Sequence, residues 1–449
     1  MKEKKEADLE PIYDARVLGK PRMILLGLQH MFAMFGATVL VPAITGLSVS
    51  DTLLFAGLGT LLFHLITKRK IPAFLGSSFA FLAAYTGIAP HGEVNLLPYA
   101  CFGVACAGLV YLVIAALFKA FGADKVMRYF PPIVTGPIII AIGLCLSGWA
   151  LSNCVKNWGI AFVAIAVVIV CNIWGKGMVK IIPILLGIIA SYTVAAVTGN
   201  VDFTAVRQAA WIGLPFHWRN TVFSLIGHAD TGLLLTAVVT IVPISIATIM
   251  EHIGDISAIS STVGENFIED PGLHRSLTGD GLATIVASLF GAPANTTYGE
   301  NTGVLNLTRV YDPRVIRLAA CFAVILSFCP KFAAIIEVMP TATLGGVSLI
   351  LYGMISAVGV RNIVENQVDF TKSRNVIIAA LILVLAVGVK YGTGADEAIV
   401  FKIGSFVIKL SGIATSALVG IILNAILPGN DYHFGRTAES DASADLGRY

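Results

Sequence analysis

The chain is divided into long apolar segments with few charged side chains, such as Met23–Ala43 and Tyr99–Phe121. A helix needs about 20 apolar residues to cross a bilayer, and these segments have that length. The segments are continuously apolar and do not alternate with polar residues, which excludes the strands of a membrane β-barrel. Charged residues make up only 13% of the 449 residues, against about 25% in a typical soluble domain. The sequence therefore predicts an all-α polytopic membrane protein.

Several function classes are disfavoured by the composition. The net charge of +3 is small and dispersed, which argues against a nucleic-acid partner. The seven cysteines stand singly in apolar segments, so they indicate neither a disulfide framework nor a metal site. The sequence contains no phosphate-binding Gly-Lys-Ser/Thr loop and no nucleophile–base set. We therefore expect no metal, no cofactor and no enzymatic activity.

Fourteen segments account for the apolar pattern, if two short interrupted ones are included. With that number both termini lie on one side, and connections on that side hold most of the 30 Lys and Arg residues. Cytoplasmic loops carry such an excess, so we expect both termini to be cytoplasmic. The expected segments are about 23–43, 52–67, 71–81, 99–121, 132–151, 158–174, 181–198, 231–253, 280–290, 291–310, 315–329, 335–358, 375–389 and 412–427.

Three short motifs recur at nearly constant spacing in the second half of the chain. Gln29-His30 is matched by Glu251-His252, Pro72-Ala73 by Pro293-Ala294, and a Pro-x4-Gly motif at 131 by another at 340. Any one match has little weight, but all three occur in register. Each half would hold seven segments, and an odd number inverts the second copy in the membrane.

The third and tenth segments, 71–81 and 291–310, are interrupted by proline and glycine. Pro72 and Gly76 lie in the first, and Pro293, Gly299 and Gly303 in the second. Such residues free backbone polar groups that hydrocarbon cannot satisfy, so irregular backbone at this depth lies beside a cavity or a ligand. Paired interrupted segments are the best pointer in a sequence to a transporter site.

Three carboxylates near these segments are candidate site residues. Glu300 lies in the tenth segment, where a charge costs roughly 2.5–3.5 kcal/mol on insertion scales. Glu251 ends an apolar run, where it marks either a site or only a helix end. Asp255 lies one turn beyond Glu251 on the same helix face. Neighbouring carboxylates can take up and release protons, as proton coupling requires, but Asp255 fits a solvated helix end equally well.

Two polar features of the first half have alternative interpretations. His30 lies in an apolar helix and serves either an interhelical hydrogen bond or direct ligand contact. Ser77, Ser78 and Phe79 lie where a broken segment would expose backbone N–H donors and an aromatic face. A simple packing crossover is the alternative for this stretch.

The motif Glu300-Asn301-Thr302-Gly303, followed by Thr308-Arg309, is similar to the signature of the nucleobase–ascorbate transporter family. Gln29-His30 and the stretch from Pro72 to Phe81 match further motifs of that family. The resemblance runs from about residue 22 to 428 and is to the bacterial uracil permeases of the family. It implies fourteen segments as two inverted sevens, with a short antiparallel strand in each of the third and tenth segments.

The resemblance also implies a core domain that moves against a gate domain, in the plasma membrane of a bacterium. A homodimer is expected from the resemblance alone. The implied divisions are a cytoplasmic tail (1–21), core (22–128), gate (129–230), core (231–332), gate (333–428) and a second cytoplasmic tail (429–449).

The family pattern assigns roles to individual residues. Glu251 and Glu300 would hydrogen-bond a uracil ring, and the backbone amides of Phe79 and Gly299 would donate to its carbonyls. Ala37, Phe79 and Tyr298 would line the ring, and Glu251, Asp255 and His30 would serve proton coupling. Some uracil permeases have histidine where this chain has Asp255.

The sequence therefore predicts a secondary transporter that imports uracil by proton symport, with H+ as the coupling ion. Family members for xanthine or urate usually carry Gln at the position of Glu300, which favours a pyrimidine here. A purine carrier and a sodium-coupled nucleobase symporter remain the alternatives of the same fold. An anion channel of similar architecture is the alternative from a different class.

Overall fold

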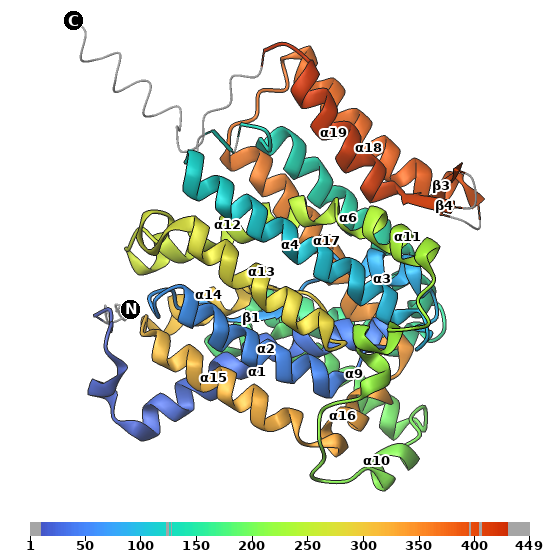
Figure 1. Ribbon diagram of the computed structural model, residues 1–449. Coiled ribbons are helices and arrows are strands. Elements are labelled where there is room, and N and C mark those ends of the chain that lie inside the picture. The colour runs from blue at the N-terminus through green and yellow to red at the C-terminus, as the bar shows by residue number, and fades with distance from the viewer. Residues whose placement is uncertain (1–9, 123–124, 127, 395–396, 404–405, 430–449) are drawn as a thin grey trace, which may run out of the picture.

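The computed structural model describes residues 10–122, 125–126, 128–394, 397–403 and 406–429, and it is mostly helical, as predicted (Figure 1). The first half of the chain consists of η1 (Ala15–Leu18), α1 (Lys20–Thr45), α2 (Val49–Ile66), β1 (Leu75–Ser77), α3 (Leu82–Ile88), α4 (Leu97–Phe121), α6 (Pro132–Cys154), α7 (Trp158–Trp174), α8 (Met178–Ile181), α9 (Pro183–Val197), α10 (Thr204–Gln208), η2 (Trp218–Asn220) and η3 (Val222–Leu225).

The second half repeats the pattern of long helices with one interrupted segment. It consists of α11 (Thr231–Ile241), α12 (Ile244–Val263), η4 (Ile268–Gly272), α13 (Leu273–Leu289), β2 (Asn295–Thr297), α14 (Gly299–Thr308), α15 (Pro313–Ser327), α16 (Pro330–Glu337), α17 (Thr341–Glu365), α18 (Ser373–Gly392), β3 (Ala398–Ile403), β4 (Phe406–Ser411) and α19 (Gly412–Ile426).

With α11 and α12 taken together as one span, seven helical spans of the described residues are long and apolar enough to cross a membrane, or eight if the bent pair α15–α16 is also one span. Three further apolar helices, α7, α9 and α19, are shorter. The chain is thus a multi-pass membrane protein, while the count of fourteen segments stays a prediction. Of the predicted cytoplasmic tails, residues 1–9 and 430–449 lie outside the described residues.

The interrupted third and tenth segments each begin with a short strand, and the two strands pair antiparallel. The register sets Leu75 opposite Thr297, Gly76 opposite Thr296 and Ser77 opposite Asn295. Pro72 and Pro293 precede the strands, because a proline has no N–H to contribute to a helix or a ladder. The predicted antiparallel strands in these segments are therefore confirmed.

Helix packing follows the same repeat. Helix α2 of the first half contacts α15 of the second half, and α13 of the second half contacts α4 of the first half in the corresponding way. Helix α6 packs along α17, and the pair α7–α9 is matched by α18–α19. Small residues allow these approaches: a Cβ at Gly143 on α6 would lie 2.2 Å from the Tyr352 carbonyl oxygen on α17. The boundaries between core and gate stay a prediction.

The predicted loop between the eighth and ninth segments, 256–279, is shorter than expected. Helix α12 continues to Val263 and α13 begins at Leu273, whereas hydropathy ended and began those segments near residues 253 and 280. Two of the polar side chains there bond within their own helices. Ser260 donates to the Ile256 carbonyl at 2.7 Å and Thr278 to the His274 carbonyl at 2.6 Å.

Two further features differ from the sequence prediction. The eighth segment is not one helix but breaks between α11 and α12 at Val242-Pro243, because proline removes a backbone donor. A hairpin of β3 and β4 stands between the last two long helices, where no strand is expected from the sequence. Strand β4 contacts α11 (Figure 1).

Candidate functional site

The two strands cross at the centre of a locally two-fold arrangement of backbone hydrogen bonds. Beyond the ladder, Ser78 N–H donates to the Ala294 carbonyl at 2.9 Å, and Tyr298 N–H donates to the Phe74 carbonyl at 3.1 Å. The same shift in residue number carries Ser78 to Tyr298 and Phe74 to Ala294. An inverted repeat produces this symmetry, and it brings the interrupted segments of the two halves together.

The predicted backbone donors lie directly after the strands. Gly299 is the first residue of α14, so its amide has no acceptor within its own helix. Phe79 lies between β1 and α3, and its amide makes no backbone hydrogen bond within the described part of the chain. Phe79 is half-buried and Gly299 is exposed. Both N–H groups are thus available to acceptor atoms of a ligand.

The predicted carboxylates lie near the N-terminus of α14, where Gly299 is found. Glu251 and Asp255 lie one turn apart on α12, and Glu300 lies in the first turn of α14. Glu251 interacts electrostatically with Asp255, Glu300 and Asp280. All three predicted carboxylates are half-buried. The structure therefore places Glu251 and Glu300, both from the second half of the chain, close enough to interact.

Asp255 also binds the strand segment directly. Thr297 donates a hydrogen bond of 2.7 Å from Oγ1 to Asp255 Oδ2. The other carboxylate oxygen, Oδ1, lies 3.8 Å from the position that a Cβ would take at Gly299. Asp255 is thus next to the N-terminus of α14, where a negative charge is favourable.

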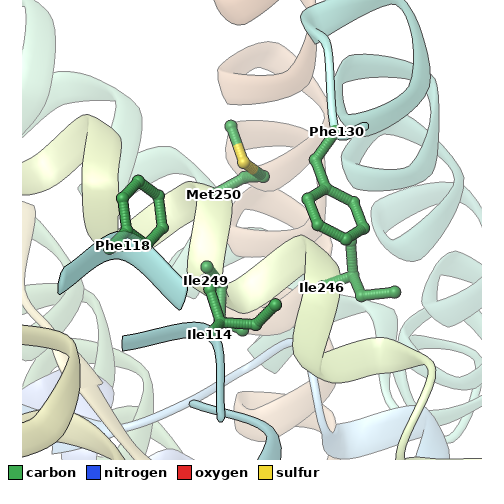
Figure 2. Close-up of a pocket in the computed structure, with 6 residues that line it drawn as sticks. All are labelled: Ile114, Phe118, Phe130, Ile246, Ile249 and Met250. Atoms are coloured by element: carbon green, nitrogen blue, oxygen red, sulfur yellow. The ribbon is translucent and has the colours of Figure 1, made fainter. Parts of the chain in front are cut away.

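Space is present on the exposed side of these helices. A Cβ added to Gly254 on α12 or Gly303 on α14 would meet no atom within 4 Å. A pocket near α12 is lined only by apolar side chains, among them Met250, next to Glu251 in sequence (Figure 2). A second pocket lies between α2 and α13, with Gly59 and Ala283 in its lining. Glu251 and Glu300 line neither of these two pockets.

The tyrosine of the predicted ring-binding set is held tightly. Tyr298 is 4% exposed, donates from its hydroxyl to the Ser77 carbonyl at 2.9 Å and accepts from Thr38 at 3.3 Å. Ala37 is adjacent to Thr38 on α1 and is buried. A Cβ at Gly76 would lie 2.4 Å from Tyr298 Cζ, so glycine is required under this ring. The ring of Tyr298 therefore has a fixed place between α1 and β1.

His30 joins α1 to α14. Asn301 Nδ2 donates to the His30 carbonyl at 3.1 Å and lies 3.2 Å from His30 Nδ1. Because Asn301 Nδ2 is a donor, Nδ1 accepts and the proton of the neutral ring is on Nε2. The interhelical hydrogen bond foreseen for His30 is present, while its role in proton coupling stays a prediction.

Sequence reasoning missed a buried pair next to the site. His252 Nδ1 and Asp280 Oδ2 are 2.9 Å apart with both side chains fully buried, although their orientation does not meet hydrogen-bond geometry. His252 follows Glu251 on α12, and Asp280 lies on α13. Asp280 could have been recognised as a buried carboxylate from the sequence, because it lies in a segment that continues into apolar sequence. It was missed because Asp280 was taken as the edge of a span.

The sequence is similar to known permeases over most of its length. A model of a permease family matches residues 21–394. The chain is 44% identical over 418 residues to the uracil permease of Bacillus caldolyticus, which covers 90% of this chain and 92% of that one. It is 38% identical over 422 residues to the uracil permease of Escherichia coli strain K12, with 90% of each chain covered.

Solved structures share the fold at low sequence identity. The transmembrane domain of the cyanobacterium bicarbonate transporter BicA has a TM-score of 0.57 at 13% identity, and the match covers 92% of this chain and 98% of that one. SLC26A9 has a TM-score of 0.64 at 12% identity, with 92% of this chain and 66% of that one covered. The similarity to these two structures concerns the fold alone.

Proposed function

Because this chain belongs to the nucleobase–ascorbate transporter family of permeases, we propose that it is a secondary active transporter that imports uracil together with protons. The observation that carries the proposal is the interaction of Glu251 with Glu300 at the N-terminus of α14, next to the free amide of Gly299. The family membership excludes an enzyme, as predicted, because the family consists of permeases.

The chemistry of the site is complementary to a pyrimidine ring. Uracil presents two N–H donors and two carbonyl acceptors around a flat ring. An ionised carboxylate can only accept hydrogen bonds, and a backbone N–H group can only donate them. Carboxylates therefore match the ring N–H groups, and backbone N–H groups match the ring carbonyls. We assign Glu251 and Glu300 to the ring N–H groups and the amides of Phe79 and Gly299 to the carbonyls. Phe79, Tyr298 and Ala37 would contact the face of the ring.

The relatives support this substrate over a purine. Both relatives described above are uracil permeases, and each match covers about nine-tenths of this chain. Glu300 supports the same choice, because an amide in its place would both donate and accept. A xanthine or urate carrier is the second candidate within the family.

Protons are the coupling ion of the proposal. Glu251, Asp255 and Glu300 form a cluster of like charges, and binding a proton relieves their repulsion. Uptake of one proton with each substrate would therefore neutralise part of the cluster. Asp255 and His30 are assigned to this step together with Glu251. Asp255 lies one turn from Glu251 on α12, and His30 is bonded to Asn301, the residue that follows Glu300.

The proposed transport step is movement of the core domain against the gate domain around a fixed site. Both site carboxylates, the strands and α1 belong to the core, so they would move together. We place the protein in the cytoplasmic membrane of a bacterium with both termini cytoplasmic, and we propose a homodimer.

The test is uptake of labelled uracil into proteoliposomes. An imposed inward proton gradient in sodium-free buffer is expected to drive accumulation, and excess unlabelled uracil to abolish it. Competition by xanthine or urate would instead support the purine carrier, and a requirement for sodium would exclude proton coupling. Current that does not saturate with substrate would indicate a channel.

A further inference from the structure

A buried threonine of α2 holds the strand β1. Leu75 N–H donates to Thr60 Oγ1 at 2.9 Å, and the Leu75 carbonyl oxygen lies 3.2 Å from the same hydroxyl. The single hydroxyl hydrogen is shared with the carbonyl of Ala56, 2.8 Å away in the same helix. Thr60 and Leu75 are both fully buried, so no water competes for these groups.

A threonine of α13 holds β2 in the same way. Asn295 N–H donates to Thr284 Oγ1 at 3.2 Å, and Oγ1 donates to the Asn295 carbonyl at 3.0 Å. Thr284 is 1% exposed. The two halves of the chain thus build the same contact twice, although the loop between Thr60 and Leu75 is longer than that between Thr284 and Asn295.

The two anchored residues stand in equivalent positions relative to the site. Leu75 precedes Phe79 by as many residues as Asn295 precedes Gly299. Each threonine therefore fixes the strand that leads into one of the two free amides. Each strand has only three residues and a single partner, and an isolated two-stranded pair is marginally stable. Its orientation depends on contacts from the surrounding helices.

We propose that Thr60 and Thr284 are positioning residues for substrate recognition, which set the direction of the Phe79 and Gly299 amides through β1 and β2. The inference rests on the proposed function, because it takes these amides as the donors to the substrate carbonyls. The hydroxyls act through the strands and do not touch the substrate.

The test uses substitutions that separate the hydroxyl from the side-chain volume. Thr60→Val and Thr284→Val remove the hydroxyl at nearly constant volume, whereas Thr60→Ser and Thr284→Ser keep it. Thr67→Val is the matched control, because Thr67 is buried at the end of the same helix and its hydroxyl donates at 2.8 Å to the Phe63 carbonyl of its own helix.

The first measurement is the Kd for uracil of each purified variant, by calorimetry. Each Val variant is expected to bind roughly three- to tenfold more weakly, from the usual strength of side-chain hydrogen bonds within membrane proteins. The Ser variants and Thr67→Val are expected to stay within about twofold of the unsubstituted chain. Unchanged affinity in both Val variants, or equal loss in the Ser variants, would overturn the inference.

The second measurement does not depend on the substrate. Hydrogen exchange at 75–79 and 295–299 should become faster in the matching Val variant and stay unchanged in Thr67→Val. Unchanged exchange in Thr60→Val and Thr284→Val would overturn the inference. If the unsubstituted chain binds no uracil while exchange responds as expected, the proposed function fails, and only the anchoring of β1 and β2 by the two hydroxyls is supported. If a Val variant does not fold, the inference is tested by the affinity of the Ser variant and by hydrogen exchange in the unsubstituted chain. Rapid exchange at the Leu75 or Asn295 amide of the unsubstituted chain would contradict the anchoring.

Discussion

Thr297 and Asp255 join the crossing strand to the helix that carries Glu251, through a hydrogen bond of 2.7 Å from Oγ1 to Oδ2. Asp255 therefore has two tasks in the proposed mechanism. It holds the junction of β2 and α14 against α12, and it belongs to the acidic cluster that is proposed to take up protons. Substitutions can separate the two.

Asp255→Asn should keep uracil binding and lose proton-driven accumulation. An asparagine oxygen still accepts from Thr297, whereas the amide cannot ionise. Uracil exchange across proteoliposomes without a gradient should persist in this variant. Thr297→Val should do the opposite and weaken binding, since the strand loses its contact with α12. Full accumulation by Asp255→Asn would remove Asp255 from the coupling step.

Glu300→Gln should weaken uracil binding by roughly tenfold to a hundredfold, the range expected for losing a hydrogen bond to a charged group. The amide of glutamine also brings a donor toward a ring N–H, which is repulsive. Glu365→Gln is the control, because Glu365 is exposed and its nearest cation, Arg361, is 3.7 Å away. Calorimetry on the purified variants gives both values, and equal affinity would withdraw Glu300 from the site.

Glu251→Gln should abolish net uptake of uracil. The side chain is proposed to bind the ring, and it interacts with the other carboxylates of the acidic cluster, so its loss should affect binding and coupling together. Counterflow with labelled uracil separates the effects: retained exchange without accumulation would limit Glu251 to coupling. Normal accumulation would contradict both roles.

Asn301→Leu should destabilise the folded protein by about 1–3 kcal/mol, because the buried carbonyl and Nδ1 of His30 lose their donor. The measurement is the free energy of unfolding in mixed detergent. Asn306→Leu is the control, because Asn306 lies on the exposed face of the same helix. Equal losses of unfolding free energy in the two variants would show that the contact with His30 contributes no specific stability.

The N-terminal segment should detach from the core only in acid. Ile12 N–H donates to the Arg309 carbonyl at 2.9 Å, Tyr13 donates to the Val263 carbonyl at 2.8 Å, and Asp14 lies 2.8 Å from Arg314. The hydrogen bond with Arg16 holds the pKa of Asp14 well below its usual value of 3.8.

A carboxyl group with a lowered folded-state pKa stabilises the fold above its unfolded pKa and loses that effect as pH falls through the folded value. Hydrogen exchange in residues 10–19, corrected for the intrinsic effect of pH, should thus be constant from neutral pH to about pH 5 and rise only in more acid solution. Asp14→Asn should show, already at neutral pH, the faster hydrogen exchange in residues 10–19 that the unsubstituted chain shows in acid. The same exchange in Asp14→Asn and the unsubstituted chain would exclude this role.

The sequence predicted the features that depend on local chemistry. Proline and glycine at 72, 76, 293 and 299 indicated the interrupted segments, and the acidic residues among apolar ones indicated the site. It did not predict the extension of α12 to Val263, because serines that bond within their own helix look like loop residues to a hydropathy argument. The β3–β4 hairpin was missed because hydropathy alone assigned residues 390–411 to the connection between the last two helical segments.

The contacts that fix the site could not be predicted. Thr60 and Thr284 look like ordinary helix residues, and their role depends on which strand atom lies above each hydroxyl. The pairing of His252 with Asp280 depends on the rotation of α12 relative to α13. These are properties of tertiary register, which residue spacing alone does not determine.

Gly76 is a position at which even the smallest side chain is expected to impair the transporter. A methyl group there would displace Tyr298, which would also release Thr38 and move the start of α14. Alanine at this position would therefore push aside the ring of Tyr298, which is proposed to contact the substrate. We expect spontaneous transport-deficient mutants to recur at this codon.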